Sequence, residues 1–288
     1  VSFKMFIWLA SYPKSGNTLL RSMLAAYFFS DDGIYNFDLI KNIKQFPNIT
    51  LFENLGINIK NEKEVIKNYI KVQETFNKKN SVQFLKTHSY LFNVDNHAFT
   101  DLNNSLGVIY IVRDPRNVVT SYANHTGIEI DKAADDLINL SQMGGNLTAT
   151  RGSERTKVFT GTWSGNFNSW KSFKYQGRYL LIKYEDLINH KDLTFLKILK
   201  FIYKLQNVKF DLDQNKFEKV IETTNFSKMK KLEEQKGFFE SKIDKKTGKK
   251  IPFFNLGHEN KWEKLLDSKI KIKLEKFFKK EMEELGYL

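Results

Sequence analysis

A short polar segment near the N-terminus has the composition of a phosphate-binding loop. Tyr12–Thr18 (YPKSGNT) follows an apolar run and precedes apolar residues at helical spacing. Gly16 permits a tight turn, the N–H groups at a helix start attract anions, and Lys14 adds a positive charge. Three neighbouring side chains can donate hydrogen bonds: Ser15, Asn17 and Thr18. We predict a phosphate site here, with a plain strand-to-helix turn as the alternative; the spacing differs from the Gly-x-x-x-x-Gly-Lys of nucleoside-triphosphate loops.

A second polar segment, Arg113–Ser121 (RDPRNVVTS), follows another apolar run. Asp114 can cap a helix that begins at Pro115. Arg113 then stands at the end of a strand, and the Ser121 hydroxyl lies two turns along the helix. A guanidinium group together with a hydroxyl suits a phosphate monoester, whereas an Arg paired with a structural carboxylate is the alternative.

A third polar segment, Lys86-Thr-His88, offers a proton acceptor. The ordinary pKa of His lies near neutral pH, so His88 at a strand end could act as a general base, although an isolated His is more often structural. The absence of Cys excludes disulfides, thiolate catalysis and Cys-ligated metals. The remaining histidines have no metal-ligand spacing, and we predict no metal site: His97, His125, His190 and His258.

Four apolar, β-rich runs carry chemistry-bearing residues at their C-terminal ends: Met5–Ala10, Val82–Leu85, Val108–Val112 and Tyr179–Ile182. Helical stripes lie between them, over Leu19–Phe28 and Val65–Val72, and the chain is mostly helical after Lys191, apart from a loop over Lys236–Pro252. This alternation predicts an α/β fold: one domain over residues 1–288, with a central parallel sheet flanked by helices. Because ligands bind at the carboxyl ends of parallel strands, the four loops should converge on one P-loop-like nucleotide-binding core.

Composition limits the classes of molecule that this chain is expected to bind. The net charge of +13 in 288 residues favours an anionic ligand, and the 41% hydrophobic content favours a packed globule. The charge also permits a non-enzymatic nucleic-acid-binding protein, but the aromatic residues fall mostly at core spacing. We expect no membrane span, because no run approaches the ~18 apolar residues that one needs. The start of the chain resembles a strand more than a signal peptide, and we expect a cytoplasmic protein.

Together, these segments resemble the cytosolic-type sulfotransferases, which use 3′-phosphoadenosine 5′-phosphosulfate (PAPS) as donor. Tyr12–Thr18 is similar to the loop that binds the donor's 5′-phosphosulfate, and Arg113 with Ser121 is similar to the 3′-phosphate motif. Lys86-Thr-His88 matches the Lys-x-His motif, whose His is the catalytic base of that family.

Four later segments extend the resemblance in the same order: Gly161-Thr-Trp163 with Trp170, Tyr184–Leu187, Thr224–Phe226 with Met229, and Pro252–Gly257 with Trp262. The resemblance implies that Tyr184, Phe226 and Met229 lie on the adenine side, with Trp163 as a further candidate. It also implies that Gly257 contacts the 3′-phosphate. Asn255 and Leu256 replace an Arg and a Lys of the family pattern, and Lys249 and Lys250 are candidates to substitute for them.

The resemblance implies in-line transfer of a sulfuryl group from PAPS to a hydroxyl or amine of a small-molecule or glycan acceptor, without a metal. His88 would remove the acceptor's proton, while Lys14 and Lys86 would offset the negative charge of the reacting groups. Three other classes fit part of the pattern: an ATP–Mg kinase, a nucleic-acid-binding protein, and an inactive nucleotide-binding regulator that keeps the fold. The sequence leaves the acceptor and the oligomeric state open.

Overall fold

A central parallel sheet positions the site. The computed structural model describes residues 5–76, 83–139, 142–144, 157–243 and 248–288. Over these residues, five parallel strands pair in the order β2-β3-β1-β6-β9. Their bounds are Phe6–Ser11 for β1, Lys44–Gln45 for β2, Gln83–Thr87 for β3, Ser105–Val112 for β6 and Tyr179–Lys183 for β9. The predicted α/β fold class is confirmed.

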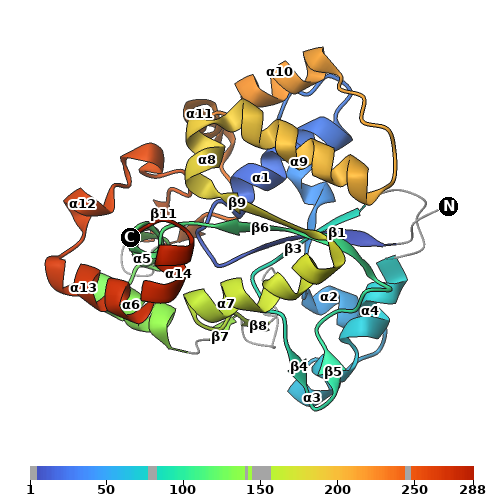
Figure 1. Cartoon of the computed structure of the whole chain (residues 1–288), viewed down its shortest axis with the longest axis horizontal. Helices are drawn as coiled ribbons and strands as arrows, with labels where there is room; N and C mark the ends of the chain where they lie inside the picture. The colour runs from blue at the N-terminus through green and yellow to red at the C-terminus, as the bar shows by residue number, and fades with distance from the viewer. Residues whose placement is uncertain (1–4, 77–82, 140–141, 145–156, 244–247) are drawn as a thin grey trace.

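Helices cover both faces of this sheet (Figure 1). One face carries α1 (Asn17–Phe29), η1 (Leu39–Asn42), α8 (Tyr184–Asn189), α9 (Lys191–Leu205), α10 (Gln214–Thr223) and α11 (Phe226–Lys236). The other carries α2 (Ile49–Glu53), α3 (Glu62–Lys67), α4 (Tyr69–Phe76), α5 (Pro115–Thr126), α6 (Ile130–Ile138), α7 (Trp163–Trp170), η2 (Lys171–Gln176), α13 (Ser268–Phe277) and α14 (Lys279–Glu284).

Short elements complete the described chain. Three antiparallel pairs join β4 (Asn93–Val94) with β5 (His97–Ala98), β7 (Gln142–Gly144) with β8 (Lys157–Phe159), and β10 (Lys242–Ile243) with β11 (Lys250–Ile251). The turn η3 (Gly257–Glu259) and helix α12 (Trp262–Leu265) precede α13. Within the described ranges, no helix is long and apolar enough to cross a membrane.

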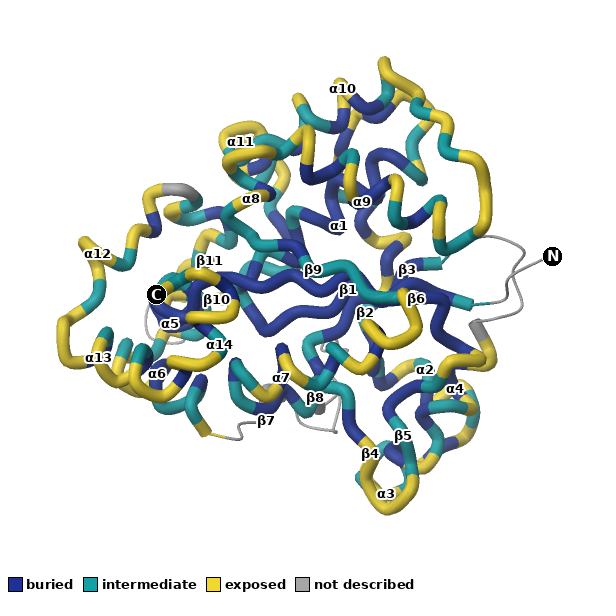
Figure 2. Tube along the Cα trace, viewed as in Figure 1, coloured by how far each residue is buried: buried dark blue, intermediate teal, exposed yellow. Residues whose placement is uncertain are grey.

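The strands are apolar on both faces because both faces are covered. In β1, Phe6, Trp8 and Ala10 pack into one core, whereas Ile7 and Leu9 pack into the other. This is the pattern of a parallel strand between two helical layers, and it explains why the run shows no polar alternation. Figure 2 shows the central strands in the dark blue of buried residues.

The predicted elements are mostly confirmed, and the differences include the following three. The short edge strand β2 was not predicted, because two residues carry no periodicity. The stripe over Val65–Val72 forms two helices, since α3 ends at a capping residue, Asn68, before α4 begins. The predicted loop over Lys236–Pro252 contains the β10–β11 pair, although residues 244–247, like Val82 of the predicted β3 run, lie outside the described residues.

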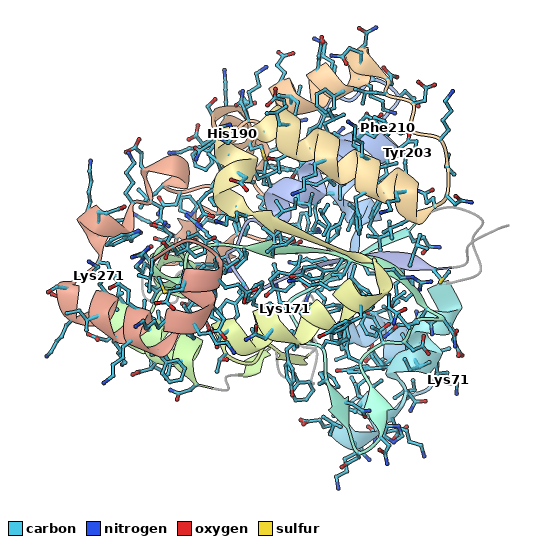
Figure 3. All side chains as sticks on the ribbon, in the orientation of Figure 1. Lys71, Lys171, His190, Tyr203, Phe210 and Lys271 are labelled. Carbon is cyan, nitrogen blue, oxygen red and sulfur yellow. The ribbon has the colours of Figure 1, made fainter. Side chains whose placement is uncertain are left out.

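The C-terminal helices are tied to the start of α5. Arg116 donates to both Asp114 and Glu275, and also to the Tyr287 carbonyl at 2.8 Å. Its guanidinium lies over the Trp262 ring, 4.0 Å from the centroid, and Lys271 of α13, labelled in Figure 3, lies 5.2 Å from the same ring. As predicted, Asp114 caps α5 by accepting from the Arg116 N–H, with Pro115 as the first residue.

Candidate active site

The loop after β1 is held in a conformation that requires Gly16. Gly16 has φ 100° and caps α1, while Lys14 also has positive φ, at 65°. A Cβ on Gly16 would lie only 2.3 Å from Cδ2 of Tyr184, so the aromatic ring packs directly on the loop backbone. Asn17 holds the loop to the strand, because its side-chain amide donates to the Leu9 carbonyl at 2.9 Å and to the Ser11 hydroxyl at 3.1 Å.

The imidazole of His88 is oriented by the end of β1. Nδ1 lies 2.9 Å from the Ser11 carbonyl oxygen, which can only accept, so Nδ1 carries the proton and Nε2 keeps a lone pair. Burial, together with the positive charge of Lys86, lowers the pKa of His88 to about 3. The ring is therefore neutral at physiological pH and able to accept a proton. Asn166 donates to the His88 carbonyl at 2.9 Å and so fixes the backbone of this strand end.

A buried ionic cluster lies beside this imidazole. Oε1 of Glu240 accepts from Nη1 of Arg21 at 2.6 Å and lies 3.7 Å from Nζ of Lys86. Oε2 accepts from the Thr18 hydroxyl at 3.1 Å. Burial lowers the pKa of Lys86 to about 8, although the Glu240 carboxylate raises it. Burial alone would raise the pKa of the Glu240 carboxyl, but the charges of Lys86 and Arg21 hold it well below its usual range.

Arg113 joins the loops that follow β1, β6 and β9. Its Nη1 donates to the Lys14 carbonyl at 3.2 Å, and its guanidinium lies 4.3 Å from the centroid of the Tyr184 ring. The side chain is buried, and within the described part of the chain its Nε–H has no hydrogen-bond partner. Ser121, from the adjoining helix α5, lines the same cavity as Arg113.

One cavity of about 1640 Å³ receives nearly all of the predicted site residues. Ser15 is the exception, because its side chain is fully buried and does not line the cavity. The predicted residues that line it are Lys14, Gly16, Asn17, Thr18, Lys86, His88, Arg113, Ser121, Tyr184, Phe226, Met229 and Gly257. The four strand-end and loop segments therefore converge as the sheet topology predicts.

The C-terminal wall of the cavity is built by close packing. Gly257 has φ 56°, and a Cβ there would meet the Phe226 ring at 2.5 Å, so the ring lies flat against the backbone. Asn255 and Leu256 line the cavity, whereas Lys249 and Lys250, the candidates to replace the family's cations, do not. Trp163 is also not among the lining residues: it is 1% exposed, and its Nε1 donates to the Arg113 carbonyl.

The cavity residues that the sequence reasoning missed include Arg21 and Glu240. Arg21 interrupts an otherwise apolar helical stripe, and this is a signal that could have revealed it. Glu240 carries no sequence signal, since its partners Thr18 and Arg21 lie more than 200 residues away and Lys86 more than 150. Among the other histidines, His190, labelled in Figure 3, lies between α8 and α9. It does not line the cavity. Among the described residues, no group of three or more His, Asp or Glu side chains is arranged to hold a metal.

Comparisons with known proteins agree with this geometry. The chain matches the sulfotransferase domain family over residues 5–286, so it belongs to that family. No curated protein sequence matches it significantly. Among solved structures, it is similar to mouse sulfotransferase SULT7A1 complexed with PAP, with 18% identity, a TM-score of 0.55, and coverage of 97% of this chain and 85% of the other. It is also similar to retinol dehydratase complexed with androsterone and the inactive cofactor PAP, with 14% identity, a TM-score of 0.56, and coverage of 97% and 81%.

Proposed function

We propose that this sulfotransferase uses PAPS as its donor and a hydroxyl or amine of a small molecule or glycan as its acceptor. The observation that carries the proposal is the convergence of the Tyr12–Thr18 loop, Arg113 with Ser121, and Lys86 with His88 on one cavity. Two similar structures were solved with PAP. PAP is adenosine 3′,5′-bisphosphate, the nucleotide that remains after PAPS has lost its sulfuryl group. We further propose that residues 1–288 form one such domain, since the family match covers 5–286.

The residues present suit a nucleotide with phosphates at both ends of its ribose. The backbone N–H groups of the loop and of the start of α1 would hold the 5′-phosphate, with Lys14 beside them. Arg113 would hold the 3′-phosphate, because it lines the cavity and its buried Nε–H has no partner among the described residues. Ser121 and the Gly257 backbone would complete that subsite, and Tyr184, Phe226 and Met229 would lie against the adenine.

Bound PAPS supplies a sulfuryl group on a good leaving phosphate. His88 accepts the proton of the attacking hydroxyl or amine at Nε2, because Nδ1 is engaged by the Ser11 carbonyl. A bond forms between sulfur and the acceptor atom while the bond between sulfur and the bridging phosphate oxygen breaks. Lys14 offsets the charge that develops on that oxygen, and Lys86 offsets the charge of the group in transit.

The sheet order supports a proposal for where the acceptor enters. The donor anchors follow β1 and β6, whereas His88 follows β3, on the other side of β1. An acceptor in line with the donor must therefore approach over β3 and its neighbour β2. Lys44 and Gln45 of β2 line the cavity there, next to Lys86, because Gln45 pairs with Lys86 in the sheet. We propose that this edge receives the acceptor.

Calorimetric titration of the full chain tests the donor assignment. Adenosine 3′,5′-bisphosphate should bind without added metal, and ATP with Mg²⁺ should bind more weakly. PAPS labelled with ³⁵S should then pass its label to at least one member of a panel of phenols, sugars and amines. Binding of ATP–Mg²⁺ as tight as that of the bisphosphate would overturn the assignment in favour of a phosphoryl-transfer enzyme.

A further inference from the structure

The ionic cluster of Thr18, Arg21, Lys86 and Glu240 has the form of an anion site with a carboxylate in it. Three donors from α1 and β3 converge on the two oxygens of Glu240, at 2.6 Å from Arg21, 3.1 Å from Thr18 and 3.7 Å from Lys86. Arg21 is 3% exposed and Lys86 is 7% exposed. Two buried cations and a hydroxyl thus surround one carboxylate, which leaves the cluster with a net positive charge.

This arrangement exceeds what a structural ion pair needs. A bidentate Arg–carboxylate pair is self-sufficient, but here Glu240 is shared among three groups, and the Nε–H of Arg21 is buried without a partner among the described residues. Arg21 is held independently of Glu240, because its Nη2 donates to the Ile43 carbonyl at 3.2 Å. The guanidinium would therefore stay in place if the carboxylate left.

The cluster lies between the donor loop and the base. Thr18 ends the phosphate-binding loop, and Lys86 stands two residues before His88 on the same strand end. All of these side chains line the one cavity. The charges of Lys86, Glu240 and Arg21 all act on the His88 imidazole, so the cluster lies close to the place where an acceptor would meet that base.

Resting on the proposed function, we infer that Thr18, Arg21 and Lys86 form the subsite for the transferred sulfuryl group, and that Glu240 is an internal competitor which the donor displaces. Arg21 is then a sulfuryl-binding residue of this chain. The oxygens of a sulfuryl group can accept the hydrogen bonds that the Glu240 carboxylate accepts, but both anions cannot occupy the same position. Phe238, buried among the rings of Phe37, Phe253 and Phe254, anchors the backbone, so displacement can be confined to the Glu240 side chain.

The inference predicts opposite effects for two substitutions. Glu240→Gln removes the competing charge, so PAPS affinity should rise about tenfold, the order expected for one charge-assisted hydrogen bond. Adenosine 3′,5′-bisphosphate lacks the sulfuryl group, so its affinity should stay the same. Arg21→Gln removes a ligand, so PAPS affinity should fall about tenfold while bisphosphate affinity is retained.

The test is calorimetric titration of the full chain with PAPS, the bisphosphate and inorganic sulfate, in the absence of acceptor. Glu234→Gln, which removes the same charge from an exposed position on α11, is the control and should leave the PAPS-to-bisphosphate affinity ratio unchanged. A gain of affinity in Glu240→Gln cannot arise from misfolding.

The outcomes separate this inference from the donor assignment. If neither nucleotide binds but inorganic sulfate binds more tightly to Glu240→Gln than to the parent chain, the anion subsite stands and the donor assignment fails. If the bisphosphate binds, yet Glu240→Gln leaves the affinities for PAPS and for sulfate unchanged or weaker, Glu240 is a structural partner of Arg21 and the inference is overturned.

Discussion

The two walls of the cavity are built by different means. In the strand-end wall, formed by Lys14, Lys86, His88 and Arg113, hydrogen bonds to the main-chain carbonyls of Ser11 and Lys14 fix the His88 and Arg113 side chains. The Lys86 side chain is held by its ion pair with Glu240. The C-terminal wall, formed by residues 224–226, 229, 239–240, 251 and 253–257, relies on packed rings, such as Phe226 on Gly257. The sheet thus holds the groups that we propose to act on the donor and acceptor, whereas aromatic packing shapes the surface around them.

Two arginines of one segment, Arg113 and Arg116, also differ in what they contact. Arg113 faces the cavity, and Arg116, three residues later, faces away to join Asp114, Glu275 and the Tyr287 carbonyl. A structural Arg paired with a carboxylate was one alternative for this segment, and it describes Arg116. Arg113 therefore serves ligand binding in our proposal, while Arg116 connects the sheet to the C-terminal helices.

The largest effect is expected at the strand-end wall, at His88. His88→Ala should lower kcat about 10²- to 10⁴-fold, because the acceptor's proton then has no positioned base. Affinity for adenosine 3′,5′-bisphosphate should not change, since the imidazole does not hold the nucleotide. The measurement is release of bisphosphate from PAPS with a competent acceptor, with His190→Ala as the control. Equal loss in both variants would contradict the assignment of His88.

Gly16→Ala tests the place where the donor loop meets Tyr184. The new Cβ would lie 2.3 Å from the Tyr184 ring, so loop or ring must shift, and bisphosphate affinity should fall about tenfold to a hundredfold. Gly56→Ala is the matched control, because Gly56 also has positive φ but has nothing within 4 Å of its Cβ position. Calorimetry on both variants separates the steric effect from the backbone strain. Similar losses of bisphosphate affinity in the two variants would contradict the steric explanation.

The ionisation of Lys86 should appear in the pH profile. Burial lowers the pKa of Lys86 to about 8, so its charge is present below that pH and is lost above it. Consequently kcat/KM should fall as pH rises through about 8, with no acidic limb from His88 near neutrality, because the His88 pKa is lowered to about 3. Lys86→Arg keeps its charge and should move this limb to higher pH. An unmoved limb would assign the ionisation to another group.

The smallest effect concerns the C-terminal wall. Asn255→Arg combined with Leu256→Lys restores the cations of the family pattern at positions that line the cavity. Affinity for the bisphosphate should rise about tenfold, and affinity for 5′-AMP should stay constant, because only the bisphosphate carries the 3′-phosphate. Ile272→Arg, which adds a charge at an exposed position of α13, is the control. An equal gain for both nucleotides would indicate a non-specific field effect.

The strand-end wall could be predicted from the sequence, and the C-terminal wall only in part. Loop chemistry after a buried strand is local, so Lys14, His88 and Arg113 could be assigned from their neighbours along the chain. The strands β1, β3, β6 and β9 were found for the same reason, because each contains a run rich in apolar residues. β2 was missed, since a two-residue strand depends on its pairing with β3.

The parts of the site that the sequence did not predict depend on long-range contacts. The role of Glu240 depends on its hydrogen bonds from Thr18 and Arg21, which lie more than 200 residues away in the chain. The side-chain donors of the loop also have different hydrogen-bond acceptors, and their spacing in the sequence does not predict which acceptor each one has. Thr18 donates to Glu240, whereas Asn17 donates back to the strand. These hydrogen-bond partners depend on packing around the folded loop, so they cannot be predicted from the neighbouring residues in a single sequence.

The central claim is that the loops after β1 and β6 hold a nucleotide with a 3′-phosphate. The most direct test is the ratio of the dissociation constants for 5′-AMP and adenosine 3′,5′-bisphosphate, measured by calorimetry on the parent chain, Arg113→Ala and Ser121→Ala. Arg178→Ala, outside the cavity, is the control. The account predicts a preference of the parent chain for the bisphosphate of about a hundredfold, lost in Arg113→Ala, reduced in Ser121→Ala and kept in the control. Equal affinity of the parent chain for the two nucleotides, or an unchanged preference in Arg113→Ala, would contradict it.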